Sequence, residues 1–403
     1  MYIITVSPLN KGIFKENLTY YCPKEVSLGS MVMAPVRQKE VPALVVDVKS
    51  ARNLKSSLKQ ADFKLKKISP ATEKQMFQPL FLEAIKLTAE YFGTGLGQTL
   101  KTFTPQAILD NPEMLFEKKI KKKIKTEIEN KVEPQEIQVI QDLNSVRLGL
   151  YKSMIREAFA KNQSVFLLLP TATDVDKVLP AVEKGIADYI YILHGKLNKK
   201  ELIKRWQEAL SEDHPILIIG TPICLSLPRA DLALIIVEQE NSPIYKTLNR
   251  PFIDARTLIS FLNKTANYQT VLGDQVLRTE TIYAAGQGHL APINNLKFRF
   301  ISEAKHQLID LTRDIEAGDQ VKTPDKADKF ESTMISDDLE KLIIENHSHD
   351  ENMIIITGQR GLSPVIFCQD CRKSVTCPHC QAPAVLHQKG KERYLMCHKC
   401  GRM

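Results

Sequence analysis

The chain has 403 residues, 43% of them hydrophobic and 25% charged, which is ordinary for a folded protein of about two to four domains. This composition excludes collagen and a wholly disordered chain, and no apolar run approaches the roughly 18 residues that a membrane span needs. The first residues lack a basic leader and a signal-peptide core, so we expect a cytoplasmic protein with no membrane partner.

The formal net charge of +8 is concentrated at the two ends of the chain. Residues 1–100 hold 14 basic and 8 acidic side chains, and residues 365–403 hold 7 basic and 2 acidic ones. Two basic ends indicate a polyanionic partner, and nucleic acid is the commonest such partner. A solvated surface with a chance excess of lysine is the alternative.

Residues 1–105 are predicted to form a small antiparallel β-barrel followed by a helix. Segments 2–6, 30–35 and 43–48 are rich in β-forming residues and are separated by turns that contain Pro, Gly and Lys. Residues 72–92 then carry apolar side chains at helical spacing.

Residues 106–145 are predicted to be an exposed, charged linker. The segment 118–125 contains six lysines, and a mixed acidic stretch follows it. A dedicated DNA-binding arm is the alternative that such a lysine run leaves open.

Residues 146–364 are predicted to form a parallel α/β lobe. Short apolar strands, divided by helical segments, are expected at residues 165–169, 189–193, 216–219 and 232–237. Near-continuous apolar strands of this kind are typical of a sheet that is buried on both faces. We also expect a loose polar insertion over residues 303–350 and a further buried strand at residues 353–357.

Residues 365–403 contain six of the eight cysteines, arranged in three Cys-x-x-Cys pairs. The pairs are Cys368 with Cys371, Cys377 with Cys380, and Cys397 with Cys400. A short turn aims both sulfurs of a pair at one ion, and two turns complete a tetrahedral thiolate site for zinc. A disulfide scaffold is disfavoured because no export signal precedes it.

Six different short motifs follow one another along the chain. They are residues 193–197 (Leu-His-Gly-Lys-Leu), 219–221 (Ile-Gly-Thr), 234–237 (Leu-Ile-Ile-Val), 254–256 (Asp-Ala-Arg), 272–273 (Leu-Gly) and 360–361 (Arg-Gly). Together with the barrel, the lobe and the cysteines, this order resembles the primosomal protein N′ (PriA) family of bacterial replication-restart helicases. The resemblance implies a multidomain α/β protein with a small N-terminal β-barrel-like DNA-binding domain, a parallel helicase-like lobe and a C-terminal zinc-binding module.

The resemblance also implies a pocket for the end of a DNA strand. In the family, an aromatic-acidic-aromatic segment and a distant lysine surround the terminal nucleotide. The corresponding residues here are Leu18, Thr19 and Tyr20, with Lys64 as the lysine. Tyr20 would stack on a base and Lys64 would contact a phosphate. The acidic member is absent and Arg37 replaces a glycine, so Tyr20 as a barrel-core residue is the alternative.

The phosphate-binding loop of the family is missing. A P-loop ATPase needs a Gly-rich turn, a lysine on the phosphates and a Ser or Thr hydroxyl on magnesium. Residues 144–149 (Asn-Ser-Val-Arg-Leu-Gly) stand at that position without the motif, and we expect no apolar strand before them. Arg147 or Lys152 is the nearest substitute for the phosphate-binding lysine, but without the cradle.

The acidic box of the family is altered as well. Its Asp-Glu-Glu-His sequence reads Glu238, Gln239, Glu240 and Asn241 here, and residues 274–276 (Asp-Gln-Val) replace the Ser-Ala-Thr coupling segment. Catalysis of phosphoryl transfer is mostly positioning and electrostatic stabilisation. We therefore expect that the lobe has lost ATPase activity and that ATP and Mg²⁺ are not cofactors.

In the family, two inner cysteine pairs share one zinc ion and two outer pairs share another. The resemblance therefore implies one complete Zn²⁺ site and half of a second one. The complete site is Cys377, Cys380, Cys397 and Cys400, and the half-site is Cys368 and Cys371. The family continues beyond this point with a fourth pair, so we expect either a gene fragment or a natural truncation.

The resemblance implies a DNA-binding protein of replication restart that is degenerate in its motor lobe. Its expected partners are forked DNA or DNA with a free strand end, single-strand-binding protein and other primosome proteins. Two alternatives remain. One is an active ATP-dependent DNA helicase whose remaining parts lie outside this chain, and the other is a zinc-ribbon protein that binds RNA.

Overall fold

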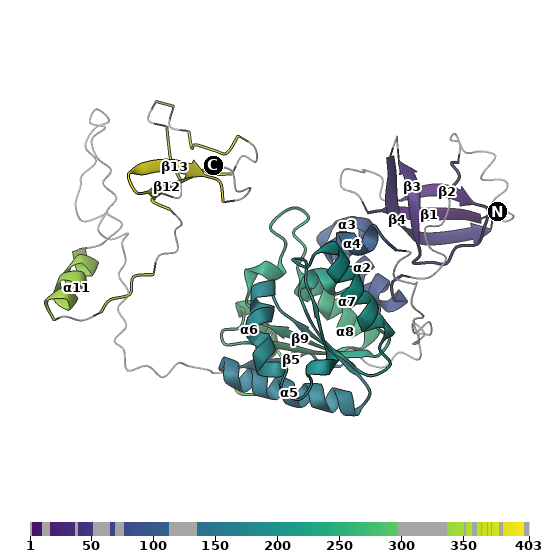
Figure 1. Ribbon diagram of the computed structural model, residues 1–403, viewed down its shortest axis with the longest axis horizontal. Helices are drawn as coiled ribbons and strands as arrows, with labels where there is room; N and C mark the ends of the chain where they lie inside the picture. Colours follow the sequence, from purple (N-terminus) through teal and green to yellow (C-terminus); the bar gives the residue numbers. More distant parts are fainter. Residues whose placement is uncertain are drawn as a thin grey trace. The chain divides into compact units, whose positions relative to one another are not determined.

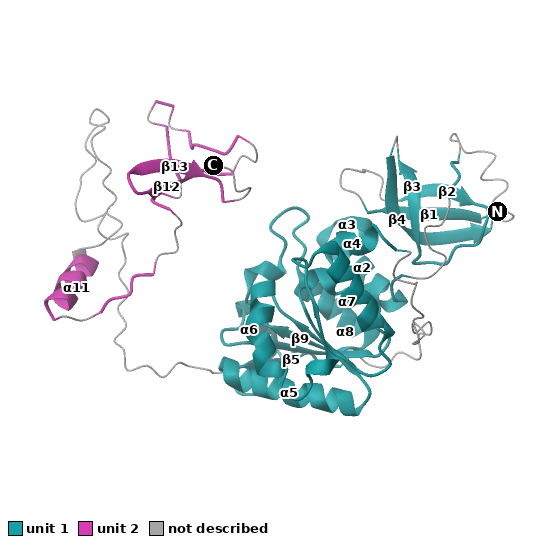
Figure 2. Ribbon diagram, in the orientation of Figure 1, with its two compact units in different colours: residues 1–300 teal, residues 301–403 magenta. Residues whose placement is uncertain are grey.

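The computed structural model divides into two units, residues 1–300 and residues 301–403 (Figure 2). It describes residues 2–9, 17–36, 39–50, 65–68, 76–112, 135–296, 337–349, 352–356, 361–363, 365–368, 370–371, 373–378, 382–398 and 403. Four predicted site residues, Arg37, Lys64, Cys380 and Cys400, lie outside these ranges. Within the same ranges, none of the helices has the length and apolar character that a membrane crossing requires.

The first unit begins with a four-stranded antiparallel sheet in the order β2-β1-β4-β3 (Figure 1). Its strands are β1 (Tyr2–Pro8), β2 (Leu18–Cys22), β3 (Met31–Val36) and β4 (Lys39–Ser50). Alternating side chains such as Ile4, Tyr20 and Val45 form one core cluster on a single face. The predicted antiparallel β-structure is confirmed, as an open half-barrel, because β2 and β3 are the two edges of the described sheet.

Three helices follow and connect this sheet to the rest of the unit. They are α2 (Pro79–Phe92), α3 (Leu96–Thr102) and α4 (Gln106–Leu109). Gly97 of α3 packs directly on the end of β1, since a Cβ atom there would lie 2.2 Å from the carbonyl oxygen of Pro8. Thr265 donates a hydrogen bond to the Leu80 carbonyl of α2 at 3.1 Å. The half-barrel and the α/β lobe are thus joined through packed helices.

The lobe is built on a seven-stranded parallel sheet in the order β11-β5-β10-β9-β6-β8-β7. Its strands are β5 (Gln138–Gln141), β6 (Ser164–Leu168), β7 (Ile190–Leu193), β8 (Leu217–Gly220), β9 (Leu232–Glu238), β10 (Gln269–Asp274) and β11 (Ala291–Pro292). The predicted parallel α/β lobe is therefore confirmed. It starts earlier than expected, because β5 lies inside the segment that we predicted to be a linker, residues 106–145.

Helices cover both faces of this sheet (Figure 1). They are α5 (Asn144–Ala160), α6 (Ala172–Val182), α7 (Lys199–Ser211), α8 (Ala255–Ala266) and α9 (Thr279–Gly286), with short 3-10 turns η3 (Ala187–Tyr189), η4 (Pro222–Cys224) and η5 (Pro243–Tyr245). Apolar side chains of α5 and α6 form one buried cluster with the sheet, and those of α7 and α8 form another. This two-sided burial explains why the strands read as continuous apolar runs.

The second unit contains helix α11 (Asp337–Ser348) and an antiparallel hairpin of β12 (Val385–Lys389) and β13 (Glu392–Met396). The buried strand predicted at residues 353–357 is wrong for its described part. Residues 353–356 have no regular secondary structure and are exposed, with Ile354 88% and Ile356 91% accessible. An apolar segment becomes a buried strand only when it pairs with a sheet, and among the described residues none pairs with 353–356.

Candidate functional site

The carboxyl edge of an open parallel sheet is where such folds bind their ligands. Here β5 ends at Gln141 and α5 begins at Asn144, so only Asp142 and Leu143 connect them. Our expectation that no strand precedes this helix is wrong, because β5 occupies that position. A phosphate loop takes up about eight residues at such a junction. The two-residue connection leaves no room for that loop.

The first carboxylate of the altered acidic box is held in a buried ion pair. Arg147, on the first turns of α5, pairs with Glu238 at the end of β9, with Nε at 3.1 Å from Oε2. Tyr151, one turn further along α5, donates its hydroxyl to the same oxygen at 2.7 Å. All three residues are buried. This network fills the space between α5 and the sheet at the ligand-binding edge.

The pKa values in this network follow from burial and charge. Burial works against the charge of Arg147, but the hydrogen bond and negative charge of Glu238 outweigh it and raise the pKa of the guanidinium. Burial, reinforced by the charge of Glu238, raises the pKa of Tyr151 well above its ordinary value. Arg147 therefore stays charged and Tyr151 stays protonated, as a donor to Glu238.

Gly273 of β10 is required for this arrangement. A Cβ atom at Gly273 would lie 1.7 Å from the hydroxyl oxygen of Tyr151. Any larger residue would displace the tyrosine ring from Glu238. The Leu-Gly motif at residues 272–273 thus has a local steric function here.

The second carboxylate of the box is also paired. Glu240 is fully buried and accepts hydrogen bonds from the Arg278 Nε at 2.5 Å, the Arg278 backbone N–H at 3.1 Å and the Thr281 hydroxyl at 2.6 Å. Arg278 and Thr281 belong to the start of α9. Magnesium binds free carboxylate oxygens and water. In this structure both carboxylates, Glu238 and Glu240, are instead paired with arginine side chains.

The Asp-Ala-Arg motif stabilises the same edge from the side of α8. Arg256 forms a 2.7 Å ion pair with Asp254 and donates to the Glu240 carbonyl oxygen at 2.5 Å. Burial works against ionisation of Asp254, but the hydrogen bond and charge of Arg256 lower its pKa. Gln239 adopts a left-handed φ of 55°, and the Asn241 N–H donates to Asp274 at 2.8 Å. The box is therefore a turn whose polar groups are bonded to the neighbouring elements of the lobe.

The predicted DNA-end residues are only partly described. Thr19 is exposed on β2, whereas Tyr20 is 5% exposed and donates its hydroxyl to the Pro35 carbonyl at 3.1 Å. Burial raises the pKa of Tyr20. Tyr20 therefore lies in the core of the half-barrel, and its ring cannot stack on a base in this conformation.

The outer edge of β2 carries basic residues that the sequence did not single out. Residues 65–68 run alongside β2, with the Tyr21 N–H bonded to the Lys66 carbonyl at 3.1 Å and the Ile68 N–H bonded to the Tyr21 carbonyl at 3.0 Å. The side chains of Lys66 and Lys67 are exposed. Tyr21 is the half-buried aromatic on this strand, on the face opposite Tyr20. The period-2 alternation of residues along β2 was the sequence signal that places Tyr20 and Tyr21 on opposite faces of the strand.

An open groove lies beside the helical connection. Its volume is about 500 Å³, and its lining includes Gly93, Thr94, Gln98, Arg250 and Phe252. Phe252 is 47% exposed and Arg250 is also exposed. Basic grooves that also expose aromatic rings are typical of proteins that bind single-stranded nucleic acid.

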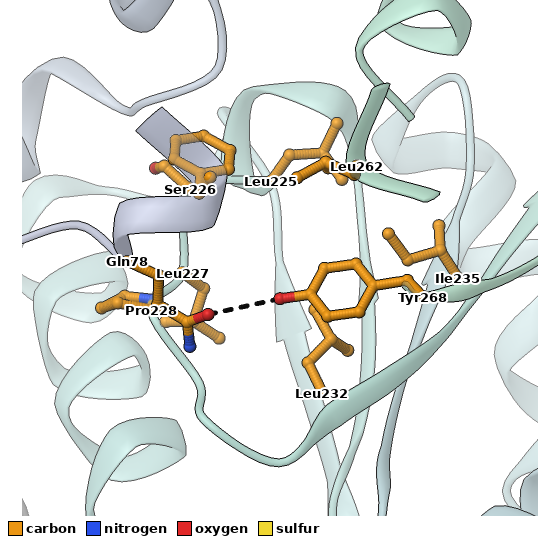
Figure 3. Close-up of a pocket in the computed structure, with 10 residues that line it drawn as sticks. Gln78, Leu225, Ser226, Leu227, Pro228, Leu232, Ile235, Leu262 and Tyr268 are labelled. Carbon is orange, nitrogen blue, oxygen red and sulfur yellow. Dashed lines mark hydrogen bonds between the residues drawn. The ribbon is translucent and has the colours of Figure 1, made fainter. Parts of the chain in front are cut away.

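The small cavity in Figure 3 lies where the helical connection meets the lobe. Its volume is about 10 Å³, and apolar side chains of α2, β9 and α8 surround it. Tyr268 donates its hydroxyl to Gln78 Oε1 at 3.3 Å. The Gln78 Nε2 and Ser226 Oγ atoms are buried without a partner among the described residues. A single water molecule fits this space, and a nucleotide does not.

The cysteine module is described at four of its six positions. Cys377 and Cys397 are buried, Cys368 is partly exposed and Cys371 is exposed. Backbone hydrogen bonds from Cys371 and Asp370, together with the Cys371 side chain, lower the pKa of Cys368. Among the described residues no group of three or more potential ligands comes together. Cys380 and Cys400 stand outside that set, so the complete predicted zinc site is not among the described residues.

Comparison of the sequence with known proteins relates the chain to a family. A family model described as the PriA 3′ DNA-binding domain matches residues 6–105. The replication restart protein PriA of Helicobacter pylori strain 26695 is 23% identical over 391 residues, which cover 95% of this chain and 57% of the relative. The Rickettsia conorii protein of the same name is 23% identical over 407 residues, covering 95% and 58%.

A third relative, the replication restart protein PriA of Chlamydia muridarum, is 28% identical over 258 residues, which cover 64% of this chain and 32% of the relative. The chain spans less than two thirds of the length of each of these relatives. The N-terminal half-barrel matches the family's DNA-binding domain, and the similarity to the first two relatives extends through the lobe and into the cysteine pairs. The chain belongs to the PriA family of replication restart proteins.

Proposed function

We propose that this chain is a DNA-binding protein of replication restart, in which the N-terminal half-barrel recognises DNA with a free strand end and the α/β lobe is a scaffold without ATPase activity. The match of residues 6–105 to the family's 3′ DNA-binding domain carries the first part of the proposal. Single-strand-binding protein and other primosome proteins are the partners that such a role implies.

The ion pair between Arg147 and Glu238 supports the second part. To bind Mg²⁺, Glu238 would have to leave a buried guanidinium and a buried tyrosine hydroxyl. Separating a buried pair costs about 3–5 kcal/mol. In an active site, phosphate contacts from a Gly-rich loop would offset such a cost. The two-residue connection between β5 and α5 offers none of those contacts.

The exposed cations support DNA as the partner. Lys66 and Lys67 stand beside β2, and Arg250 and Phe252 line the groove next to α2. Lysines contact phosphates without sequence preference, and an exposed ring adds base stacking. Lys64, the predicted phosphate contact, and Arg37 lie outside the described residues and remain predictions.

The test compares DNA forks with a free 3′ end, forks with a blocked 3′ end and single-stranded RNA of the same sequence. We expect the free-end fork to bind most tightly, and all binding to weaken as salt rises. Equal affinity for the RNA would favour the zinc-ribbon alternative. Equal affinity for free and blocked forks would contradict recognition of strand ends.

A steady-state ATPase assay with the same forks tests the lobe. We expect turnover at background for the wild type and for Glu240→Gln alike. Turnover of about 1 per second or faster, in the ordinary range of enzymes, and abolished by Glu240→Gln, would establish the active-helicase alternative instead.

We also propose that the cysteine module holds one structural zinc ion, at Cys377, Cys380, Cys397 and Cys400. The burial of Cys377 and Cys397 supports a site closed to solvent, and the hydrogen bonds to Cys368 support a thiolate turn at the half-site. A structural zinc contributes on the order of 10–16 kcal/mol of apparent binding free energy to modules of this size.

Elemental analysis of the reduced protein measures the zinc directly. We expect one tightly held zinc per chain, and unfolding of the module when Cys377 or Cys400 is replaced by Ser. Two tightly held ions would contradict the half-site at Cys368 and Cys371. The absence of zinc would overturn the site itself.

A further inference from the structure

Two histidines meet on the surface of the β12–β13 hairpin. His387 belongs to β12, and His398 follows the end of β13. Their Nε2 atoms are 2.8 Å apart, their ring centroids are 5.0 Å apart and their rings are tilted by 59°. His398 is exposed and His387 is half-buried, so solvent reaches the pair.

The surrounding backbone and side chains hold His387 in this position. Tyr394 is its cross-strand partner in the hairpin register, and the two rings stack with centroids 5.5 Å apart and 20° between their planes. On the other side of β12, the Leu362 N–H donates to the Leu386 carbonyl at 2.7 Å. A Cβ atom at Gly361 would lie 3.2 Å from the His387 ring. The imidazole is therefore confined before any ligand arrives.

Two imidazole nitrogens at this distance have two chemical uses. In the first, the Nε2–H of one ring donates a hydrogen bond to the Nε2 of the other. In the second, both rings are deprotonated at Nε2 and bind the same metal ion. Metal–imidazole bonds are about 2.0–2.1 Å long, so two nitrogens at right angles around one ion lie about 2.9 Å apart. The observed separation fits that angle closely. A tetrahedral pair would be wider, at about 3.3 Å with the same bond lengths.

We propose that His387 and His398 form a two-histidine chelate for a divalent transition-metal ion that prefers right-angled ligands, of the Ni²⁺ or Cu²⁺ type. Among the described residues no third His, Cys, Asp or Glu side chain joins the pair. The pair shares no ligand with the proposed four-cysteine zinc site. It depends neither on DNA binding nor on the state of the lobe.

An open, two-ligand site binds its metal reversibly. It differs from a closed structural site, which keeps no position for water. The pair therefore adds an exchangeable metal site next to the cysteine module, on the same hairpin that connects Cys377 to Cys397.

Calorimetric titration with Ni²⁺ tests the proposal on the full, untagged chain after zinc loading. We expect a Ni²⁺ site whose affinity is about tenfold weaker or worse in His387→Gln and in His398→Gln, because losing one ring removes the chelate. The matched control is His289→Gln, an exposed histidine of the first unit, which should bind Ni²⁺ as the wild type does.

Zinc content, measured on every variant, shows whether the module remains intact. If His398→Gln releases zinc, His387→Gln decides the question, since residue 387 lies seven positions from the nearest predicted cysteine ligand, Cys380, whereas His398 directly follows Cys397. Failure of the wild type to bind Ni²⁺ at millimolar concentration would overturn the proposal. Wild-type affinity in both variants would reduce the pair to a hydrogen bond between two rings.

Discussion

Charged side chains lie in opposite environments at the carboxyl edge of the seven-stranded sheet and at the β2 edge of the half-barrel. At the first, Glu238 and Glu240 are buried and each is paired with an arginine. At the second, Lys66 and Lys67 stay on the surface. The first edge has the location of a ligand site, and the second has the exposed charges of one. Location in a fold does not by itself provide function, because chemistry requires groups that are not already bonded.

The two edges also differ in how much their charged residues contribute to the free energy of folding. A buried ion pair returns little net stability over apolar residues of the same volume, but removal of one partner is costly. Exposed lysines contribute little to folding and are available to a polyanion. The lobe should therefore respond to mutation through its stability, and the half-barrel edge through its binding.

The largest expected effect is on Glu238. Replacement by Ala leaves the Arg147 guanidinium buried without its counter-charge, and we expect a loss of about 3–5 kcal/mol in the free energy of unfolding. Urea denaturation, followed by the fluorescence of Trp206 in α7, measures it. DNA affinity of the folded variant should not change.

Two controls sharpen this prediction. Glu157→Gln removes the exposed pair with Lys161 on the same helix and should leave the unfolding curve unchanged. The triple variant Arg147→Met, Tyr151→Phe, Glu238→Leu replaces the whole network by apolar groups and should recover most of the loss. Wild-type stability in Glu238→Ala alone would show that the ion pair contributes nothing.

The next effect is on DNA binding. The double variant Lys66→Ala, Lys67→Ala should bind forked DNA about tenfold more weakly, and the slope of log affinity against log salt should fall by roughly one to two, because two phosphate contacts are lost. Fluorescence anisotropy over a range of salt concentrations gives both quantities.

Lys199 and Lys200, exposed at the start of α7, provide the matched control for this variant. Their double replacement by Ala removes the same charge and should leave the salt slope as it is. Equal losses in both double variants would mean that net charge, and not the β2 edge, drives binding.

The smallest effect is at the joint between the two regions. Tyr268→Phe leaves Gln78 Oε1 buried without its donor and should cost about 1 kcal/mol. Adding Gln78→Leu removes the orphaned amide as well, so the double variant should be close to wild type in stability. Thermal denaturation checks both. Additive losses would show that the 3.3 Å hydrogen bond between Tyr268 and Gln78 is not the relevant contact.

The parallel lobe and the antiparallel N-terminal strands were predictable from sequence, because each depends on the local periodicity of apolar residues. β5 was missed because Gln138–Gln141 is only four residues long, has a polar residue at each end and gains its burial from β10 and β11. For residues 353–356 the error is the reverse. Their apolar character predicted a buried strand, but among the described residues no strand pairs with them.

The amino-acid sequence was enough to show which groups the carboxyl edge of the sheet lacks, because neither the Gly-rich loop nor its lysine occurs among the 403 residues. Which side chains occupy that edge became visible in the folded chain alone. Arg147 and Glu238 are 91 positions apart, and nothing local indicates that they pair or that Gly273 admits Tyr151 beside them. The same holds for Tyr20, whose side of the strand follows from the register of β1 and β2. Motifs are local in the chain, whereas pairing and burial depend on contacts that only the packed fold creates.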